Sequence, residues 1–382
     1  MKILFKPLFT AAIFGFSFNG AAYAQNASGD IWGLFQGAPT IEFDNGNTLK
    51  VRGRIFWDYA SLEEGSVSLD DSEFRTARLG VEGEISGVEY KAELDFSDSE
   101  LEYKDVLISV DNIAGSDVTL SLGQMKTPNA LNETTSSRHI TFMERAAITD
   151  AFGIDRRIGA MLSKGGDNYS VEAGIFGTSI EAHIDDKESN IVSAARATFT
   201  PFIDGKNIVH VGASLRYTDE ANSGSPKHSA RWGSHQAKEK IKPNVGDSAM
   251  LYGFEAATVR GPLHAQAEYM SEEGDLGSAS GYYFSAGWFL TGESRKYKAS
   301  GGKFDRTKPN SPLSKGGMGA FEIAARYDTL DASGAGDEEM AATTFGLIWY
   351  PESHLRFKLE AVNADADTYA ANSVQIRTQI DW

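Results

Sequence analysis

The sequence predicts an all-β fold, namely a 16-stranded antiparallel transmembrane β-barrel that encloses water. Three observations lead to this prediction: a removable leader, segments in which apolar and polar residues alternate, and the number and length of those segments. A membrane-spanning helix needs ~20 consecutive apolar residues. No segment after the leader approaches that length, so we expect the chain to cross a bilayer only with strands that close on themselves.

The first 24 residues have the features of a secretory signal peptide. Lys2 and Lys6 supply positive charge, residues 7–18 form a short apolar core, and the small-x-small triplet 22–24 is a cleavage site. We therefore expect export, cleavage near Ala24 and a location in the bacterial cell outer membrane. The predicted organisation is a signal peptide (1–24), a short periplasmic N-terminal segment (25–47) and one β-barrel domain (48–382).

Alternation with a period of two residues is clearest at the two ends of the predicted barrel. Residues 49–59 and 374–382 place mainly apolar side chains on one face of a strand and mainly polar ones on the other. A soluble sandwich would also alternate, so this pattern alone leaves both fold classes open. The chain stops on Trp382 directly after a strand, which is typical of the signal by which outer-membrane barrels are recognised for assembly.

Fourteen further segments bring the total to about sixteen strands, an even number of the kind that bacterial barrels have. Most are close to the ~10 residues that a tilted spanning strand needs. Several carry aromatic residues at an end of the apolar face, as interfacial girdles do. The fourteen segments are 74–85, 88–97, 101–110, 118–126, 157–164, 169–177, 190–201, 207–218, 248–259, 263–272, 281–290, 319–329, 340–350 and 355–363.

The predicted connections alternate between short turns, expected in the periplasm, and longer links, expected outside the cell. The longer links are 61–73, 127–156, 178–189, 219–247 and 364–373, whereas the short link 98–100 and the long stretch 291–318 break the rule. Sixteen strands make a barrel wide enough to hold water. Because the 127–156 link carries apolar residues such as Leu131, Ile148 and Phe152, we expect an inward-folded constriction loop in preference to an exposed lid.

The net charge of −17 argues against a nucleic-acid partner. Acids are at least as numerous as bases on the predicted inward faces, so the strands alone do not predict a positive lumen. The stretch 291–318 holds seven Lys or Arg against two acids, 224–242 holds five against one, and 61–73 holds five acids and no base.

The residues predicted to line the pore and bind the substrate are Lys50, Arg52, Arg54, Arg78, Lys91, Lys126, Arg138, Arg156, Arg157, Arg196 and Arg216. A salt bridge within the wall is the alternative for each of them.

Three blocks of sequence resemble the family of phosphate-selective porins O and P. They are VRGRIFWDYA (51–60) with FRTARLGVEGEISGVEYKAELDF (74–96), then LGQMKTPNALNETTSSRHITFMERA (122–146) with DRRIGAML (155–162), and finally LTGESRKYKASGGKFDRTKP (290–309) with GGMGAFEIAARYDTLD (316–331). The resemblance implies a homotrimeric channel that passes phosphate or related anions along a track of arginines and lysines.

We therefore expect a passive outer-membrane channel for small anions, above all phosphate or polyphosphate. The runner-up is a general, weakly selective porin for small hydrophilic solutes. A barrel enzyme that acts on lipid is the third possibility, but no HExxH, GxxxxGK or GxSxG motif is present. The expected partners are inorganic anions, outer-membrane lipid and lipopolysaccharide, without nucleic acid, cofactor or metal.

Overall fold

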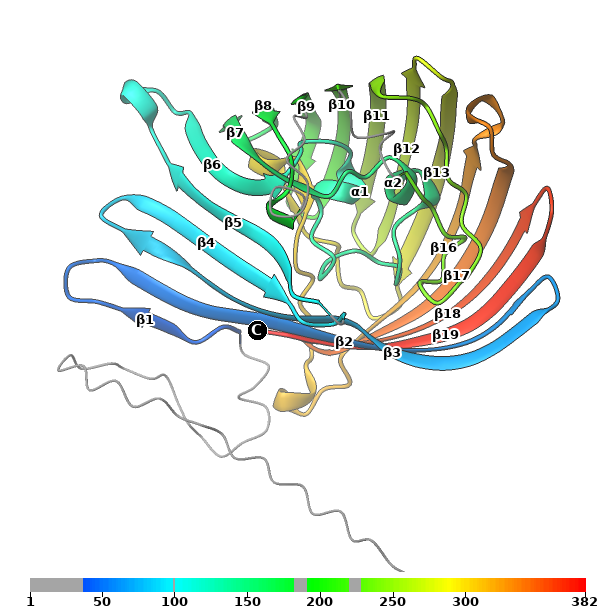
Figure 1. The fold of residues 1–382 in the computed structure, drawn as a ribbon. Coiled ribbons are helices and arrows are strands. Elements are labelled where there is room, and N and C mark those ends of the chain that lie inside the picture. The colour runs from blue at the N-terminus through cyan, green and yellow to red at the C-terminus, as the bar shows by residue number, and fades with distance from the viewer. Residues whose placement is uncertain (1–36, 99, 182–190, 220–227) are drawn as a thin grey trace, which may run out of the picture.

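Sixteen antiparallel strands form a closed ring in the computed structural model, which describes residues 37–98, 100–181, 191–219 and 228–382 (Figure 1). The predicted signal peptide lies outside these residues. The ring consists of β2 (Thr48–Glu64), β3 (Val67–Ile85), β4 (Val88–Asp95), β5 (Glu102–Val110), β6 (Thr119–Lys126), β7 (Arg156–Gly165), β8 (Tyr169–Phe176), β9 (Ile191–Asp204), β10 (Asn207–Asp219), β11 (Ser248–Arg260), β12 (Leu263–Gly274), β13 (Ser278–Phe289), β16 (Ala320–Asp331), β17 (Glu339–Glu352), β18 (Leu355–Ala366) and β19 (Ala370–Asp381).

The ring closes where β19 pairs with β2, for example Ile380 with Ile55. Gly53 occupies this seam, because a Cβ built there would lie 2.2 Å from the indole ring of Trp382. The two residues exchange backbone hydrogen bonds of 3.0 and 3.2 Å. The short strand β1 (Thr40–Glu42) pairs with the start of β2. The predicted 16-stranded barrel is confirmed, and no helix in the described ranges has the length and apolar character needed to cross a membrane.

Burial alternates residue by residue along most strands, as the sequence pattern requires. In β9, for example, the outward Phe199 is exposed and the inward Thr200 is buried. Large apolar side chains such as Ile175, Phe254 and Phe345 stay more than half exposed on the outer face. Exposed apolar surface on this scale is unfavourable in water but matches the lipid-facing band of a transmembrane barrel.

Two predicted loops are shorter than expected because the strands continue through them. The prediction of a 61–73 loop is wrong, since β2 and β3 stay paired as far as Glu64 and Val67 and only residues 65–66 turn. Gly65 has a φ of 56°, which glycine adopts at no steric cost. The predicted 364–373 loop likewise shrinks to 367–369. Both segments carry polar residues on the face that is apolar elsewhere in the strands, so the alternation by which a strand is recognised fades in them.

Three segments fold into the barrel from its ends, and we call them the 127–155, 228–247 and 291–318 inserts. The first contains helices α1 (Leu131–Thr134) and α2 (Ala147–Ala151), which lie inside the arc of strands in Figure 1. The third contains a hairpin of β14 (Tyr297–Lys298) and β15 (Lys303–Phe304) with 3₁₀ turns η3 (Ala299–Gly301) and η4 (Leu313–Lys315). Two more 3₁₀ turns, η2 (Ile113–Gly115) and η5 (Ser333–Ala335), lie between strands. The inward-folded loop predicted near 127–156 is confirmed.

Apolar side chains of the inserts form a core inside the barrel. Ile148 and Phe152 of the 127–155 insert pack with Trp232 of the 228–247 insert and with Leu251 and Leu330 of the wall, and each of the five is at most 2% exposed. One part of the lumen is therefore filled by packed protein. The remaining open space lies toward the other side, along β2 to β7.

Candidate functional site: a cation-rich cavity in the lumen

A cavity of about 680 Å³ lies between strands β2–β7, the 127–155 insert and the β14–β15 hairpin. Of the described residues that line it, thirteen are Lys or Arg and seven are Asp or Glu. The excess of positive charge contrasts with the net −17 of the whole chain. Inside a confined lumen charges interact more strongly than in bulk water. The balance of the lining therefore acts together with carboxylates just behind it, since Asp58, Glu82, Glu93 and Asp95 pair with lining arginines.

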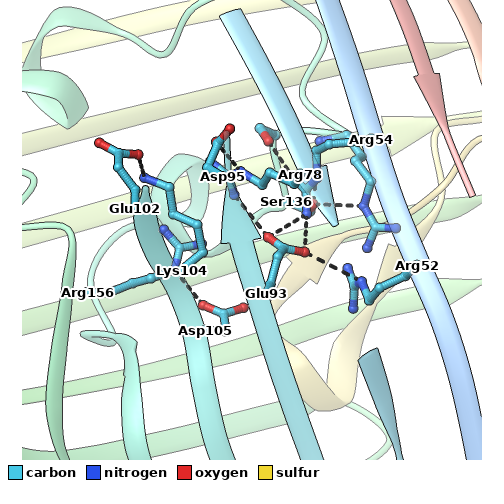
Figure 2. A network of polar contacts seen from close by, with 12 residues as sticks. Arg52, Arg54, Arg78, Glu93, Asp95, Glu102, Lys104, Asp105, Ser136 and Arg156 are labelled. Atoms are coloured by element: carbon cyan, nitrogen blue, oxygen red, sulfur yellow. Dashed lines mark hydrogen bonds and ion pairs between the residues drawn. The ribbon is translucent and has the colours of Figure 1, made fainter. Parts of the chain in front are cut away.

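Arg52, Arg54 and Arg78, which we call the arginine cluster, share one carboxylate, that of Glu93 on β4 (Figure 2). The Glu93 oxygens lie 3.0 Å from Arg54 Nη2, 3.1 Å from Arg78 Nη1 and 3.5 Å from Arg52 Nε. Arg54 also donates a hydrogen bond of 2.9 Å to Ser137 Oγ of the 127–155 insert. Cross-strand pairing places Arg54 directly opposite Arg78. Arg52 and Arg78 each bind one more acid, Glu82 and Asp95 respectively.

A second group of charges continues along β4, β5 and the start of β7. Asp105 accepts from Arg156 Nε at 2.5 Å and also pairs with Lys91. Lys104 pairs with Glu102 (Figure 2). This part of the wall is closely charge-matched, as the arginine cluster is with Glu82, Glu93 and Asp95.

The 127–155 insert supplies cations of its own. The Glu133 carboxylate lies 2.6 Å from Lys126 Nζ and 3.3 Å from Arg145 Nε. Burial opposes the charge of Glu133, but the attraction of these two cations outweighs it and lowers the pKa of this carboxyl. On the same insert, burial and the nearby Arg356, Arg306 and Arg138 lower the pKa of His139 to about 2. His139 therefore lines the cavity as a neutral imidazole.

Two lysines of the β14–β15 hairpin reach the cavity from the 291–318 insert. Lys298 and Lys303 both line it, and neither forms an ion pair with a described residue. The hairpin is held in place by other groups: Arg196 donates to the Gly302 carbonyl at 2.6 Å, and Phe304 N donates to Thr135 Oγ1 at 3.3 Å. These lysines thus sit on a fixed element while their ammonium groups stay unpaired.

Most inward acids of β11 to β18 hold the inserts and do not line the cavity. Glu268 accepts from the backbone N–H groups of Leu131 and Asn132, both at 2.7 Å. Glu360 accepts from Met143 N at 2.7 Å and Asp328 from Ala147 N at 3.0 Å. A carboxylate is a strong acceptor for an otherwise unpaired buried N–H. These acids of β11 to β18 therefore bind the inserts and lie away from the open lumen.

Seven of the predicted pore-lining residues come together around this cavity: Arg52, Arg54, Arg78, Lys91, Lys126, Arg138 and Arg156. The other four lie elsewhere. Lys50 pairs with Glu82 at 3.3 Å, and Arg157 donates to the Gly177 carbonyl at 3.3 Å. Arg196 and Arg216 point inward but are covered by the inserts, where they bind Glu255 and Glu272 respectively.

Six further cations of the cavity were not among the predicted lining residues: Arg75, Lys104, Arg145, Lys298, Lys303 and Arg377. The alternation of the last strand does predict that Arg377 faces inward, although it is not among the residues predicted to bind the substrate. The excess of positive charge in 291–318 indicated that Lys298 and Lys303 belong to a basic segment. The sequence does not indicate that Lys104 and Arg145 point into the cavity. The direction of Lys104 depends on a register shift near Ala92, and that of Arg145 on the path of the 127–155 insert.

Comparison with known proteins relates this chain to outer-membrane channels. A sequence model of the family described as phosphate-selective porin O and P matches residues 49–382. Porin O of Pseudomonas aeruginosa is 25% identical over 386 residues, which cover 85% of this chain and 85% of that protein. The anion-selective porin from Comamonas acidovorans superposes with a TM-score of 0.56 at 11% identity, over 88% of this chain and 100% of that one. OmpT of Vibrio cholerae, solved in a trimer form, gives a TM-score of 0.55 at 13% identity, over 88% and 99%.

Proposed function

This chain belongs to the family of phosphate-selective porins O and P and is an outer-membrane channel, and we propose that it passes small anions, above all phosphate or polyphosphate, by passive diffusion. The observation that carries the proposal is the excess of cations around the 680 Å³ cavity, thirteen against seven acids. The family and the fold are those of channels and not of enzymes.

The geometry of the arginine cluster suits a phosphate in transit. A guanidinium donates two parallel hydrogen bonds to an oxyanion and keeps its charge at every working pH. Arg52 and Arg78 each have a second acid, Glu82 and Asp95, whereas Arg54 has only the carboxylate of Glu93 among the described residues and shares it with the other two. The charge of Arg54 is therefore only partly neutralised. Conduction needs sites that attract an ion but release it again, and partial neutralisation by Glu93 gives sites of this moderate strength.

A general porin of weak selectivity is the second candidate. The observation in its favour is that most cavity cations are already paired, such as Lys91 and Arg156 with Asp105. In that case the charges would stabilise the wall and leave little field for the solute. The unpaired Lys298 and Lys303 favour the anion channel over this alternative.

The surroundings of the channel follow from the same proposal. The apolar outer face would contact outer-membrane lipid and lipopolysaccharide, and the chain would assemble as a homotrimer, as the trimer form of OmpT suggests. Residues 1–24 would be the export signal that is cleaved near Ala24. No cofactor or metal takes part in the proposed function.

Competition in a planar bilayer tests the choice of anion. With the purified protein in KCl, millimolar phosphate should reduce the chloride current, because both anions meet the arginine cluster and phosphate binds it more tightly. A current that phosphate leaves unchanged at every concentration would favour the general porin.

A further inference from the structure

Glu144 places a carboxylate of the 127–155 insert between two cations that lie on either side of β2. Its Oε1 and Oε2 atoms lie 3.1 and 3.0 Å from Nε and Nη2 of Arg75 on β3, so this pair is bidentate. The same Oε1 lies 2.7 Å from Nη2 of Arg377 on β19. All three residues line the cavity.

The two arginines depend on Glu144 to different degrees. Arg377 is also bound by both carboxylate oxygens of Asp58, at 2.7 and 2.6 Å, and by the Met143 carbonyl. Arg75 has no other acidic partner among the described residues. Removal of the Glu144 charge would therefore free the fork of Arg75, while Arg377 would stay engaged.

The backbone around Glu144 has anchors of its own, besides the ion pairs of the side chain. Met143 N donates to Glu360 Oε1 at 2.7 Å, and the Glu144 carbonyl accepts from Arg326 Nη1 at 2.8 Å. Burial opposes the charge of the side chain, but Arg75 and Arg377 outweigh it and hold the pKa of Glu144 well below its usual range. A charged carboxylate is thus fixed in the cavity at every pH at which the channel works.

We propose that Glu144 is a specificity-determining residue that competes, as a built-in anion, with the anion in transit for the guanidinium of Arg75. Free, Arg75 would offer phosphate a bidentate site beside the arginine cluster. A site that binds too tightly slows exit, and conduction requires release as well as entry. Glu144 keeps the cavity in the range where anions enter and also leave. This inference rests on the proposed anion channel.

The test compares phosphate block of the chloride current in the intact channel and in Glu144→Gln. The amide keeps the shape of the side chain and removes its charge, so the block should tighten on the order of threefold to tenfold, as one partly screened charge allows. The double variant Glu144→Gln with Arg75→Gln restores the net charge and should return the block to within about twofold of the original. Glu273→Gln, at an exposed carboxylate of β12, is the matched control and should change nothing.

Size exclusion of neutral polyethylene glycols separates charge from loop movement. The cut-off should be the same in Glu144→Gln as in the intact channel, because the backbone anchors at Glu360 and Arg326 remain. An intact channel that phosphate blocks, together with a Glu144→Gln channel whose block is unchanged or weaker, overturns the inference and leaves the proposed function standing. A shifted cut-off, or a double variant that stays as tightly blocked as the single one, also overturns it. An intact channel without phosphate block instead contradicts the proposed function itself.

Discussion

Arg54 combines three properties that suit an anion site at the scale of the single residue. It is 4% exposed, it lines the cavity, and it shares its carboxylate partner with two other arginines. Among the described residues its Nη1 group donates only to the hydroxyl of Ser137, a neutral partner that an oxyanion can replace. An arginine with these partners is held in place, and its incompletely neutralised charge can still attract a passing anion.

We therefore expect Arg54→Gln to weaken phosphate block of the chloride current by about tenfold, equivalent to ~1.4 kcal/mol. The reason is the loss of one guanidinium fork and of one positive charge next to Arg52 and Arg78. Lys315→Gln makes the same charge change on the exposed turn η4, outside the cavity. Titration of the current with phosphate should separate the two variants, and equal effects would show that the arginine cluster is not the binding site.

Arg75 illustrates why the sequence could reveal only part of the site. Strict alternation puts Thr76 and Arg78 on the inward face and Arg75 on the outward one. The register of β2 and β3 shifts between Phe56 and Trp57, so Arg75 has no residue opposite it on β2. Its side chain turns toward the lumen and lines the cavity. A β-bulge of this kind re-aims a side chain, and nothing in the local residue pattern announces it. Arg54 and Arg78 follow the regular pattern, and the pairing of β2 with β3 places them directly opposite each other.

At the scale of the element, the inserts decide where the lumen is open. The 127–155 insert is fixed at several points to wall acids, of which Glu268 binds the start of α1. Its backbone N–H groups at Leu131 and Asn132 are buried, so they need acceptors. The wall meets this need with carboxylates on β12, β16 and β18, far from the arginine cluster in the sequence.

Glu268→Ala should loosen the 127–155 insert, since two buried N–H groups lose their acceptor, at a cost of about 3 kcal/mol. The expected result is a noisier open-channel current and a higher cut-off for neutral polyethylene glycols, both measured in single-channel recordings. Glu273→Ala, at the exposed neighbouring carboxylate, should leave both quantities unchanged. A quiet Glu268→Ala channel with the original cut-off would show that the insert is held by its apolar core alone.

The strands could be predicted from the sequence, whereas the paths of the inserts largely could not. Where one face meets lipid, apolar residues must recur with a period of two, and the sixteen predicted segments match the sixteen strands of the ring. Beyond Tyr59 the outward face of β2 carries polar residues such as Ser61 and Glu63. The extension toward Gly65 therefore lacks the alternation of apolar and polar residues by which a strand is recognised. Segments 228–247 and 291–318 are irregular, and their places inside the barrel depend on contacts such as Trp232 Nε1 with Glu64.

At the scale of the whole molecule, charge is sorted by place. The chain carries a net −17, and acids such as Glu63, Asp70 and Asp71 gather at the end of the barrel where β2 and β3 extend. The cavity nevertheless has six more cations than acids among the described residues that line it. Salt screens charges at an open mouth within about 8–10 Å. The field in the confined cavity therefore has more influence on selectivity than the total charge of the molecule.

The reversal potential of the purified protein in a planar bilayer under a KCl gradient tests this central claim most directly. A cavity dominated by arginine and lysine predicts a potential whose sign corresponds to preferred passage of chloride. A potential of the opposite sign, which reports cation preference, would contradict the account, because it would mean that the acids of the molecule and not the cations of its cavity control the passage of ions.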